Sequence, residues 1–271
     1  MSDDQQPTRL QFLEQAFGGH AKAFESNLED VSKAHFEAYK FKLEQQKSVF
    51  KKRAELAAKV PKFWSTSLQN CGQTAQFIDA VDEDALKALT DVWIEHSASD
   101  VREYEVRFTF GKNPYFKDQV LVKKVTLTPP KGLEPAPEKP APYDLEAPVY
   151  LAEKTSIQWT SSEHDLTKKA PRPADVEGKE EYDDFDGAGS FFNWFNEVGE
   201  DRTTLGELLL EWWGHATEYA AGLASIDDES GAEFDFDDEL EDDESEDDED
   251  PKKEIDLDDD EKKRPAKKQR R

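Results

Sequence analysis

The longest regular pattern of apolar positions lies near the start of the chain. Residues 21–58 contain neither Gly nor Pro and are rich in residues that favour helices. Apolar residues recur there mostly at steps of three, four or seven, which is the spacing of one helix face. These positions are Phe24, Leu28, Val31, Phe36, Tyr39, Leu43 and Phe50. The pattern predicts one long helix over residues 21–60.

Such a helix would be roughly 50 Å or more in length. A small domain cannot cover a helix of this length, so part of the apolar stripe needs a partner outside its own domain. A second copy of the chain is the simplest partner, and we therefore expect a dimerisation helix. The alternative is a helix that packs along its own domain.

Pro61 ends this helix, because proline both removes a backbone donor and restricts the residue before it. Apolar spacing predicts further helices over residues 63–77, 82–89 and 204–221. Asp82 stands where a side chain can cap the second of these. The buried side of the last is expected to hold Leu205, Leu208, Leu209, Trp212, Trp213, Ala216 and Tyr219.

Between these helices the apolar period changes to two. Residues 101–110 alternate, with Tyr104, Val106, Phe108 and Phe110 on one face, which predicts a half-buried strand. A turn at 111–114 and a second alternating run at 116–127, with either Val122 or Leu121 inward, complete an antiparallel hairpin. A short strand is expected at 155–159, and an aromatic segment at 191–195 begins after Ser190, a cap residue.

The remaining segments carry no core pattern. Residues 1–20 are polar and expected to be flexible, residues 129–148 hold seven of the 14 prolines and are interpreted as an exposed loop, and residues 166–187 are interpreted as a mobile charged loop. The sequence predicts an α+β protein. A long N-terminal helix precedes one domain over residues 61–226, built from an antiparallel β-sheet and packed helices.

Charge changes the picture of the C-terminal region. The net charge is −27; residues 227–261 hold 23 acids and two lysines, and residues 262–271 carry +7, which leaves −13 for residues 1–226. We expect 227–261 to be a disordered acidic tail, because like charges repel and little apolar surface is available. The tail is interpreted as a polyanion that binds a basic protein, or alternatively as a solvating tail without a partner.

The basic end is interpreted as a nuclear-import segment, and the alternative is that it folds back on the acidic stretch. Its cationic residues are Lys262, Lys263, Arg264, Lys267, Lys268, Arg270 and Arg271. We therefore expect a nuclear protein, with shuttling to the cytoplasm left open. The overall negative charge argues against direct, sequence-specific binding of nucleic acid, which needs clustered Lys and Arg.

Catalytic and cofactor chemistry finds no support in the sequence. Five scattered histidines and one cysteine, Cys71, form no metal-binding or nucleophilic pattern, and no nucleotide-binding motif is present. The Gly187–Ser190 stretch lacks a following lysine, and nearby acids would repel phosphate. The single cysteine fits a reducing compartment, and no apolar run reaches the length of a membrane span. We predict a soluble protein that is not an enzyme, needs no cofactor or metal and does not enter a membrane.

Several motifs, taken in order, resemble the nucleosome assembly protein family in its SET (template-activating factor) branch. The stretch 50–64 resembles the end of that family's long helix, and the run 113–116 after an alternating strand is a family hallmark. The aromatic run 190–195 resembles its aromatic signature. Further matches lie at 82–86, 89–90, 120–121, 157–159, 165–169 and 205–207. The polar middle of the helix, at Lys42, Gln45, Gln46 and Lys47, departs from the pattern.

This resemblance implies a homodimer joined by paired long helices in a coiled coil, each carrying an "earmuff" domain. It implies a histone chaperone that binds core histones through a concave acidic surface and the tail, in nucleosome assembly and chromatin remodelling. SET-type relatives also imply an alternative, a non-catalytic regulator of a histone acetyltransferase or a phosphatase. The acids expected to bind histones are Glu163, Asp165, Asp183, Asp184, Glu200, Asp201, Glu207 and Glu211.

Overall fold

The computed structural model describes residues 8–118, 120–132, 140–172 and 188–223. The chain divides into two compact units, residues 1–229 and residues 230–271, and every described residue belongs to the first. The predicted acidic tail at 227–261 and the basic segment at 262–271 therefore lie outside the described residues. Asp183 and Asp184 also lie outside them.

The N-terminal region is helical from Arg9, which corrects the expectation of a flexible segment for residues 9–20. Helix α1 (Arg9–Phe17) begins with a capping box between Thr8 and Gln11, in which each side chain accepts the other residue's backbone N–H. This exchange satisfies donors that the first helical turn leaves unpaired. A 3-10 turn, η1 (Gly18–His20), leads into the next helix. The Thr-x-x-Gln spacing is the sequence signal that could have indicated this start.

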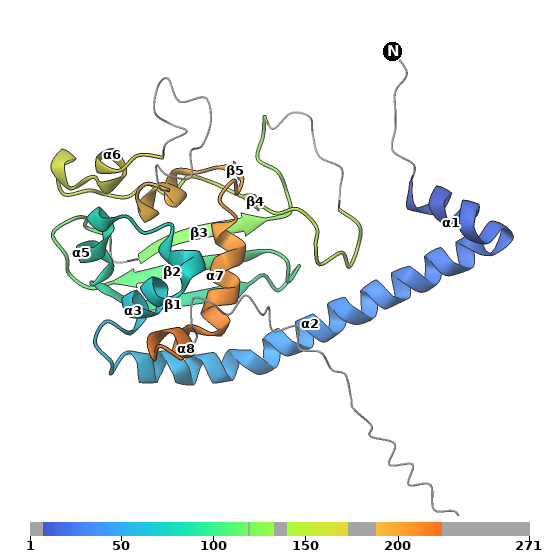
Figure 1. Cartoon of the computed structure of the whole chain (residues 1–271), viewed down its shortest axis with the longest axis horizontal. Coiled ribbons are helices and arrows are strands. Elements are labelled where there is room, and N and C mark those ends of the chain that lie inside the picture. The colour runs from blue at the N-terminus through green and yellow to red at the C-terminus, as the bar shows by residue number, and fades with distance from the viewer. Residues whose placement is uncertain (1–7, 119, 133–139, 173–187, 224–271) are drawn as a thin grey trace, which may run out of the picture. The chain divides into compact units, whose positions relative to one another are not determined.

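Helix α2 (Ala21–Ala57) confirms the predicted long helix and ends three residues before the expected boundary. Lys62 then adopts a left-handed backbone conformation, with φ 61°, and redirects the chain into the domain. Figure 1 shows the C-terminal part of α2 beside the sheet, while its N-terminal part and α1 extend beyond it. Only part of the helix is therefore covered by its own domain.

Four short helical segments connect α2 to the sheet: α3 (Phe63–Asn70), α4 (Gly72–Ala75), η2 (Ala80–Asp82) and α5 (Glu83–Leu86). The single helix expected at 63–77 is divided because Cys71 has an extended backbone, with φ −85° and ψ 111°. The side chain of Asp82 does not cap α5, contrary to the prediction. Its carboxylate instead accepts hydrogen bonds from Ser190 and Phe191, which lie far along the chain.

Five antiparallel strands form one sheet in the order β1-β2-β3-β4-β5. They are β1 (Leu89–His96), β2 (Tyr104–Phe110), β3 (Val120–Thr126), β4 (Tyr150–Leu151) and β5 (Gly199–Glu200). The hairpin of β2 and β3 confirms the alternating pattern, and Leu121 rather than Val122 faces the core. The strand predicted at 155–159 does not form, and only an isolated bridge joins Trp159 to Phe116.

The core lies between one face of this sheet and the helices that cover it (Figure 1). The helix predicted at 204–221 is two helices, α7 (Leu205–Gly214) and α8 (Ala216–Ala220), separated at His215. The Trp213 indole N–H donates to the Val92 carbonyl at 2.9 Å and so ties α7 to β1. The aromatic segment forms η6 (Phe191–Asn196), and Phe191 meets Phe108 of β2 edge to face at 5.5 Å.

Two predicted loops are partly ordered. Within 166–187, α6 (Leu166–Lys169) follows η3 (Ser162–His164), and the buried Arg172 donates to Glu197 at 2.9 Å, so the mobile-loop expectation is corrected for residues 166–172. Within the Pro-rich segment 129–148, Tyr143 packs on Phe36 of α2, with ring centroids 5.6 Å apart. The Pro-rich segment therefore contacts the long helix.

Candidate functional site

The predicted histone-binding acids fall into three groups in the structure, of which the first is exposed and unpaired. Glu163, Glu200, Glu207 and Glu211 are exposed. Within the described residues, no hydrogen bond or ion pair engages these four carboxylates. They belong to η3, β5 and α7. Exposed carboxylates without internal partners remain available to an external cation.

Asp165 and Asp201 are engaged inside the fold, so their assignment to a binding surface stays a prediction to which the structure gives no support. Asp165 is buried and pairs with Lys168 at 3.0 Å; although burial opposes it, hydrogen bonds from Thr167 and Lys168 hold the pKa of Asp165 below its usual value. Asp201 accepts the Gly206 N–H at 2.8 Å and the Trp194 indole N–H at 3.2 Å. Asp201 thereby supplies a partner for a backbone donor in the first turn of α7. The third group, Asp183 and Asp184, lies outside the described residues.

Two acids on the outer face of the sheet, Glu95 and Glu105, are paired with neighbouring cations. Glu95 binds Lys47 of α2 and accepts the Trp93 indole N–H at 2.9 Å; although partial burial opposes it, these contacts lower the pKa of Glu95. Arg107 pairs with Glu105 on the same strand. The charges of Glu95 and Glu105 are therefore neutralised within the chain. Three of the four unpaired predicted acids lie in β5 and α7.

One cavity lies beside those unpaired acids. It has a volume of about 180 Å³ and sits where β2, β3, β4 and the start of α7 meet. Glu200 and Glu207 line it, together with Tyr104. The Tyr104 hydroxyl is buried and has no hydrogen-bond partner among the residues that the structure describes. Burial, reinforced by the negative charges of Asp201 and Glu207, raises the pKa of Tyr104, so the phenol stays protonated.

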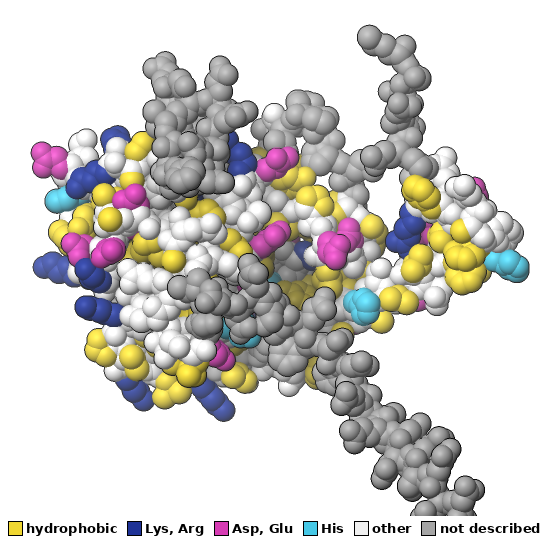
Figure 2. Space-filling model, viewed as in Figure 1, with side chains coloured by type: hydrophobic (Ala, Val, Ile, Leu, Met, Phe, Trp, Pro, Cys, Tyr) yellow, Lys and Arg dark blue, Asp and Glu magenta, His cyan; other side chains and the backbone are white. Residues whose placement is uncertain are grey.

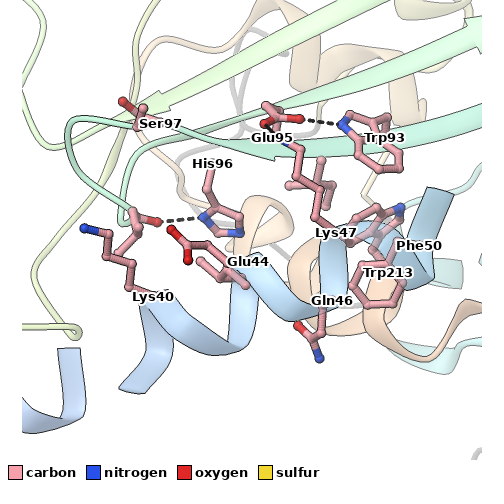
Figure 3. A pocket seen from close by; sticks show the side chains of 14 residues that line it. Lys40, Glu44, Gln46, Lys47, Phe50, Trp93, Glu95, His96, Ser97 and Trp213 are labelled. Carbon is pink, nitrogen blue, oxygen red and sulfur yellow. Dashed lines mark hydrogen bonds and ion pairs between the residues drawn. The ribbon is translucent and has the colours of Figure 1, made fainter. Parts of the chain in front are cut away.

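A second, larger cleft of about 370 Å³ lies between α2 and β1 (Figure 3). At one end, the rings of Phe50 and Trp213 lie 4.3 Å apart between centroids. At the other end, the Nδ1 atom of His96 bonds the Val101 carbonyl at 2.6 Å, and burial lowers the pKa of this imidazole. Tyr39 of α2 packs edge to face on the same imidazole. The lining residues thus join the long helix to the domain.

The seven apolar positions predicted for dimerisation separate along α2. Four of them face their own domain. Phe36 contacts Tyr143, and Tyr39 contacts His96. Leu43 lines the cleft, and Phe50 contacts Trp213. Phe24, Leu28 and Val31 are exposed, between 40% and 45%. Contacts with their own domain explain Phe36, Tyr39, Leu43 and Phe50. Phe24 packs on Phe17 of α1, with ring centroids 4.5 Å apart, and Leu28 and Val31 make no ring contact among the described residues.

Five exposed large apolar residues of α2 share one helix face, while Phe41, which is 63% exposed, lies about 100° away from Phe24. At 100° per residue, Val49 and Leu56 lie within about 40° of Phe24, on the side of Leu28 and Val31. Both are more than half exposed, at 58% and 63%. Figure 2 shows hydrophobic side chains gathered on the exposed α1–α2 end of this view. Val49 and Leu56 were not among the predicted positions of the stripe.

Two classes of site are absent from the part of the chain that the structure describes. No three His, Cys, Asp or Glu side chains lie close enough there to hold a metal ion. Among the helices of the same residues, none combines the length and apolar character that crossing a membrane requires.

Comparisons with known proteins agree with this architecture. Among proteins of similar sequence, Protein SETSIP of Homo sapiens is 29% identical over 189 residues, which is 68% of this chain and 56% of that protein. Protein SET of Drosophila melanogaster is 28% identical over 178 residues, 64% of this chain and 60% of that protein. The chain thus spans less than two thirds of the length of either relative.

Solved structures share the fold. The crystal structure of Ccp1 superposes with a TM-score of 0.55 at 21% identity, covering 76% of this chain and 97% of that one. The Vps75 histone chaperone superposes with a TM-score of 0.52 at 20% identity, covering 75% and 98%. The family model described as nucleosome assembly protein (NAP) matches residues 14–263. With this match and the shared fold, the chain belongs to the nucleosome assembly protein family.

Proposed function

We propose that this chain is a nuclear histone chaperone that acts as a homodimer and has no catalytic activity of its own. It binds core histones in nucleosome assembly, through exposed acids of the folded domain and through the acidic segment 227–261. The observation that carries the proposal is the family match over residues 14–263, together with four acids that have no partner among the described residues.

The physical argument is electrostatic. Core histones are strongly basic, and a protein of net charge −27 attracts them. Its acids compete with DNA phosphates for the basic side chains of the histones. Each contact between exposed charges is screened over about 8 Å at physiological salt, so many weak contacts are needed. The folded domain supplies fixed contacts at Glu163, Glu200, Glu207 and Glu211. The acidic segment raises the local concentration of negative charge around a bound histone.

The homodimer is supported by the exposed face of α2. Phe24, Leu28, Val31, Val49 and Leu56 lie on one side of the helix and have no cover from their own domain. A second copy of the same face would bury them. The alternative of a non-catalytic regulator of a histone acetyltransferase or a phosphatase stays a prediction, since no particular contact favours it.

The test is quantitative binding of the two kinds of core-histone pair, each purified separately, across a salt series. It compares the full chain with a chain ending at residue 226. We expect both to bind, with a shallower salt dependence for the shorter chain, because fewer ion contacts form. Changing Glu163, Glu200, Glu207 and Glu211 to Gln should weaken the shorter chain by roughly tenfold or more.

The matched control changes four exposed glutamates of α1 and α2 to Gln, namely Glu14, Glu29, Glu37 and Glu44. This control removes the same charge and should leave most of the affinity intact. If the chain ending at residue 226 bound neither histone pair at about 0.15 M salt, the folded surface would have no part in binding. If the full chain also failed to bind, the chaperone proposal would be overturned.

A further inference from the structure

The exposed apolar residues of α2 follow a seven-residue repeat that contacts with their own domain do not explain. Phe24 and Val31 lie seven residues apart. Leu28, Val49 and Leu56 form a second set, separated by multiples of seven. The second set is offset from the first by three or four residues, which is the spacing of the two core positions of a coiled coil. These five residues, here called the dimer face, therefore match a contact with another helix along nearly the whole of α2.

The middle of the dimer face is polar and separates two possible orientations of a second copy. The repeat passes there through exposed His35 and Lys42 in one set and exposed Ala38 and Gln45 in the other. In a parallel pair each position faces its own copy, so Lys42 would face Lys42. Two like charges held together in a partly dehydrated contact repel each other. In an antiparallel pair one set faces the other set, so Lys42 meets no second lysine in the core positions.

One antiparallel register joins the large apolar residues to one another. When the two-fold axis passes beside Lys40, Phe24 faces Leu56 of the second copy, because residue 40 lies midway between them. Val31 then faces Val49, since residue 40 is midway between these two as well. Symmetry repeats both contacts on the other side of the axis. The exposed residues at the two ends of α2 are thus complementary to each other.

Neighbouring registers lose these contacts. Because the repeat is seven residues, the next registers move the axis by about 3.5 residues in either direction. One of them places Val31 against Lys42, and the other carries Leu28 beyond the end of the second copy's α2. With the axis beside Lys40, Lys42 instead faces Ala38, where its methylene stem can cover the small side chain. The pattern therefore favours one register.

Phe41 supports the same axis independently. It is 63% exposed but lies about 100° from Phe24, outside the dimer face. With the axis beside Lys40, Phe41 and its copy lie about 3 Å apart along the helix direction, on the same flank of the pair. Two aromatic rings in this position cover one another. An exposed phenylalanine that the dimer face leaves unexplained is thus placed where a second copy buries it.

We propose that α2 pairs antiparallel with a second copy of itself, with the two-fold axis beside Lys40 and the two Phe41 rings packed across it. The side of α2 that contacts the domain and the side that carries Phe41 are turned in opposite senses from the dimer face. Both domains therefore lie on one side of the helix pair, and both Phe41 rings lie on the other. This inference rests on the proposed function for the existence of the homodimer, and it adds orientation and register.

The test is cross-linking of the full chain with a short bis-maleimide after cysteines are introduced singly and in pairs. The single native cysteine, Cys71, is 1% exposed, and the unchanged chain measures its background. Phe41→Cys should give a cross-linked dimer, because the residue lies beside the axis. Val31→Cys and Val49→Cys should not do so singly, because each lies roughly 27 Å from its own copy. The two substitutions combined in one chain should cross-link.

The matched control combines Val31→Cys with Leu56→Cys. It carries the same number of cysteines at exposed apolar positions, but the second is displaced by seven residues, about 10 Å along the helix. Cross-linking should be roughly tenfold slower than in the variant with Val31→Cys and Val49→Cys, because fewer reactive pairs come within reach. All substituted side chains are exposed in the single chain, so its core is unaffected. Circular dichroism checks that each variant keeps its helical content.

Three outcomes overturn the proposal. Rapid cross-linking of Val31→Cys alone would indicate a parallel pair, and faster cross-linking in the control than in the paired variant would indicate a register one repeat away. A full chain that sediments as a monomer would reject the pairing altogether. Histone binding by a dimer with a different cross-linking pattern would reject this register and keep the chaperone function. The expected pattern without histone binding would reject the chaperone function and keep the register.

Discussion

The carboxylate of Asp82 accepts a hydrogen bond from the Ser190 hydroxyl at 2.6 Å, across 108 residues of sequence. It also accepts the Phe191 N–H at 2.7 Å and the Asp79 N–H at 3.0 Å. These bonds fix the start of the aromatic segment η6 against the short helices that follow α2. Burial raises the pKa of Asp82 to about 6, although the hydrogen bonds oppose this change.

This raised pKa predicts a pH dependence of stability with a definite sign. The native state holds the Asp82 proton more tightly than the unfolded chain, whose pKa is 3.8, so stability falls as pH rises from about 4 to about 6. The full difference corresponds to on the order of 3 kcal/mol. Urea unfolding at several pH values should show this fall in the unchanged chain relative to Asp82→Asn. Identical pH profiles for the two proteins would contradict the prediction.

Gly189 is predicted to tolerate no larger side chain. Its φ is +67°, and a Cβ atom there would lie 2.5 Å from the carbonyl oxygen of Pro171. Gly189→Ala should therefore lower the free energy of unfolding by more than about 1 kcal/mol. Gly111→Ala is the control, because its Cβ would meet no atom closer than 3.6 Å and its backbone is unstrained. Equal melting temperatures for Gly189→Ala and Gly111→Ala would contradict the prediction that Gly189 tolerates no side chain.

The buried lysine of β3 predicts a second pH effect, of opposite sign to that of Asp82. Lys123 is fully buried and donates to the carbonyls of Glu153, Phe195 and Glu197. Burial lowers its pKa to about 8, although nearby acids oppose this, so the unfolded chain binds the proton more tightly. Stability should rise with pH above about 8, by on the order of 2 kcal/mol at most before tyrosines titrate.

The comparison is with Lys123→Met, measured by chemical unfolding between about pH 7.5 and 9.5. This variant should lose the rise with pH. It should also be less stable at pH 7, because three buried carbonyls lose a donor. A rise of the same size in the variant would assign the effect to another group.

The proposed dimer face predicts that a charge on one side of α2 separates the two copies. Leu28→Glu together with Val31→Glu places two carboxylates in a face that dimerisation would bury. Buried charge without a partner is costly, so the dimer dissociation constant should rise by roughly tenfold or more.

The control for the dimer prediction is Ser26→Glu, which adds a carboxylate on the opposite side of the same exposed stretch. Sedimentation of all proteins over a range of concentration gives the result. A chain that is monomeric without any substitution, or a control that dissociates as readily as the double variant, would argue against this face.

Much of the fold could be predicted from the period and spacing of apolar residues along the sequence alone. The alternation of Tyr104, Val106, Phe108 and Phe110 predicted a strand, and all four are buried. β1 was missed, because Asp91 and Glu95 interrupt its apolar positions while facing away from the core. β4 and β5 have two residues each, too few to leave a periodic signal.

The candidate site was less predictable, since composition does not separate paired from unpaired acids. Glu105 and Glu207 look alike in the sequence, but Arg107 neutralises only the first. Asp201 precedes two threonines and a helix, a spacing that could have indicated a capping role. Nothing in the sequence indicates that the Tyr104 hydroxyl lacks a partner within the described part of the chain, because that depends on packing between β2 and α7.

The two apolar faces of α2 have a mechanical consequence. By helical geometry, the side of α2 that contacts the domain, from Phe36 to Phe50, is turned roughly 100° from the exposed face that begins at Phe24. Helix α2 therefore sets the angle between each domain and the proposed dimer axis. Inserting a single residue between Val31 and Phe36 would rotate the outer part of the rod by about 100° and lengthen it by about 1.5 Å. Because Val49 and Leu56 lie beyond the insertion, the same change would also turn Phe24, Leu28 and Val31 away from them. The mutual orientation of the two domains and the continuity of the proposed dimer face thus both depend on the number of residues in α2.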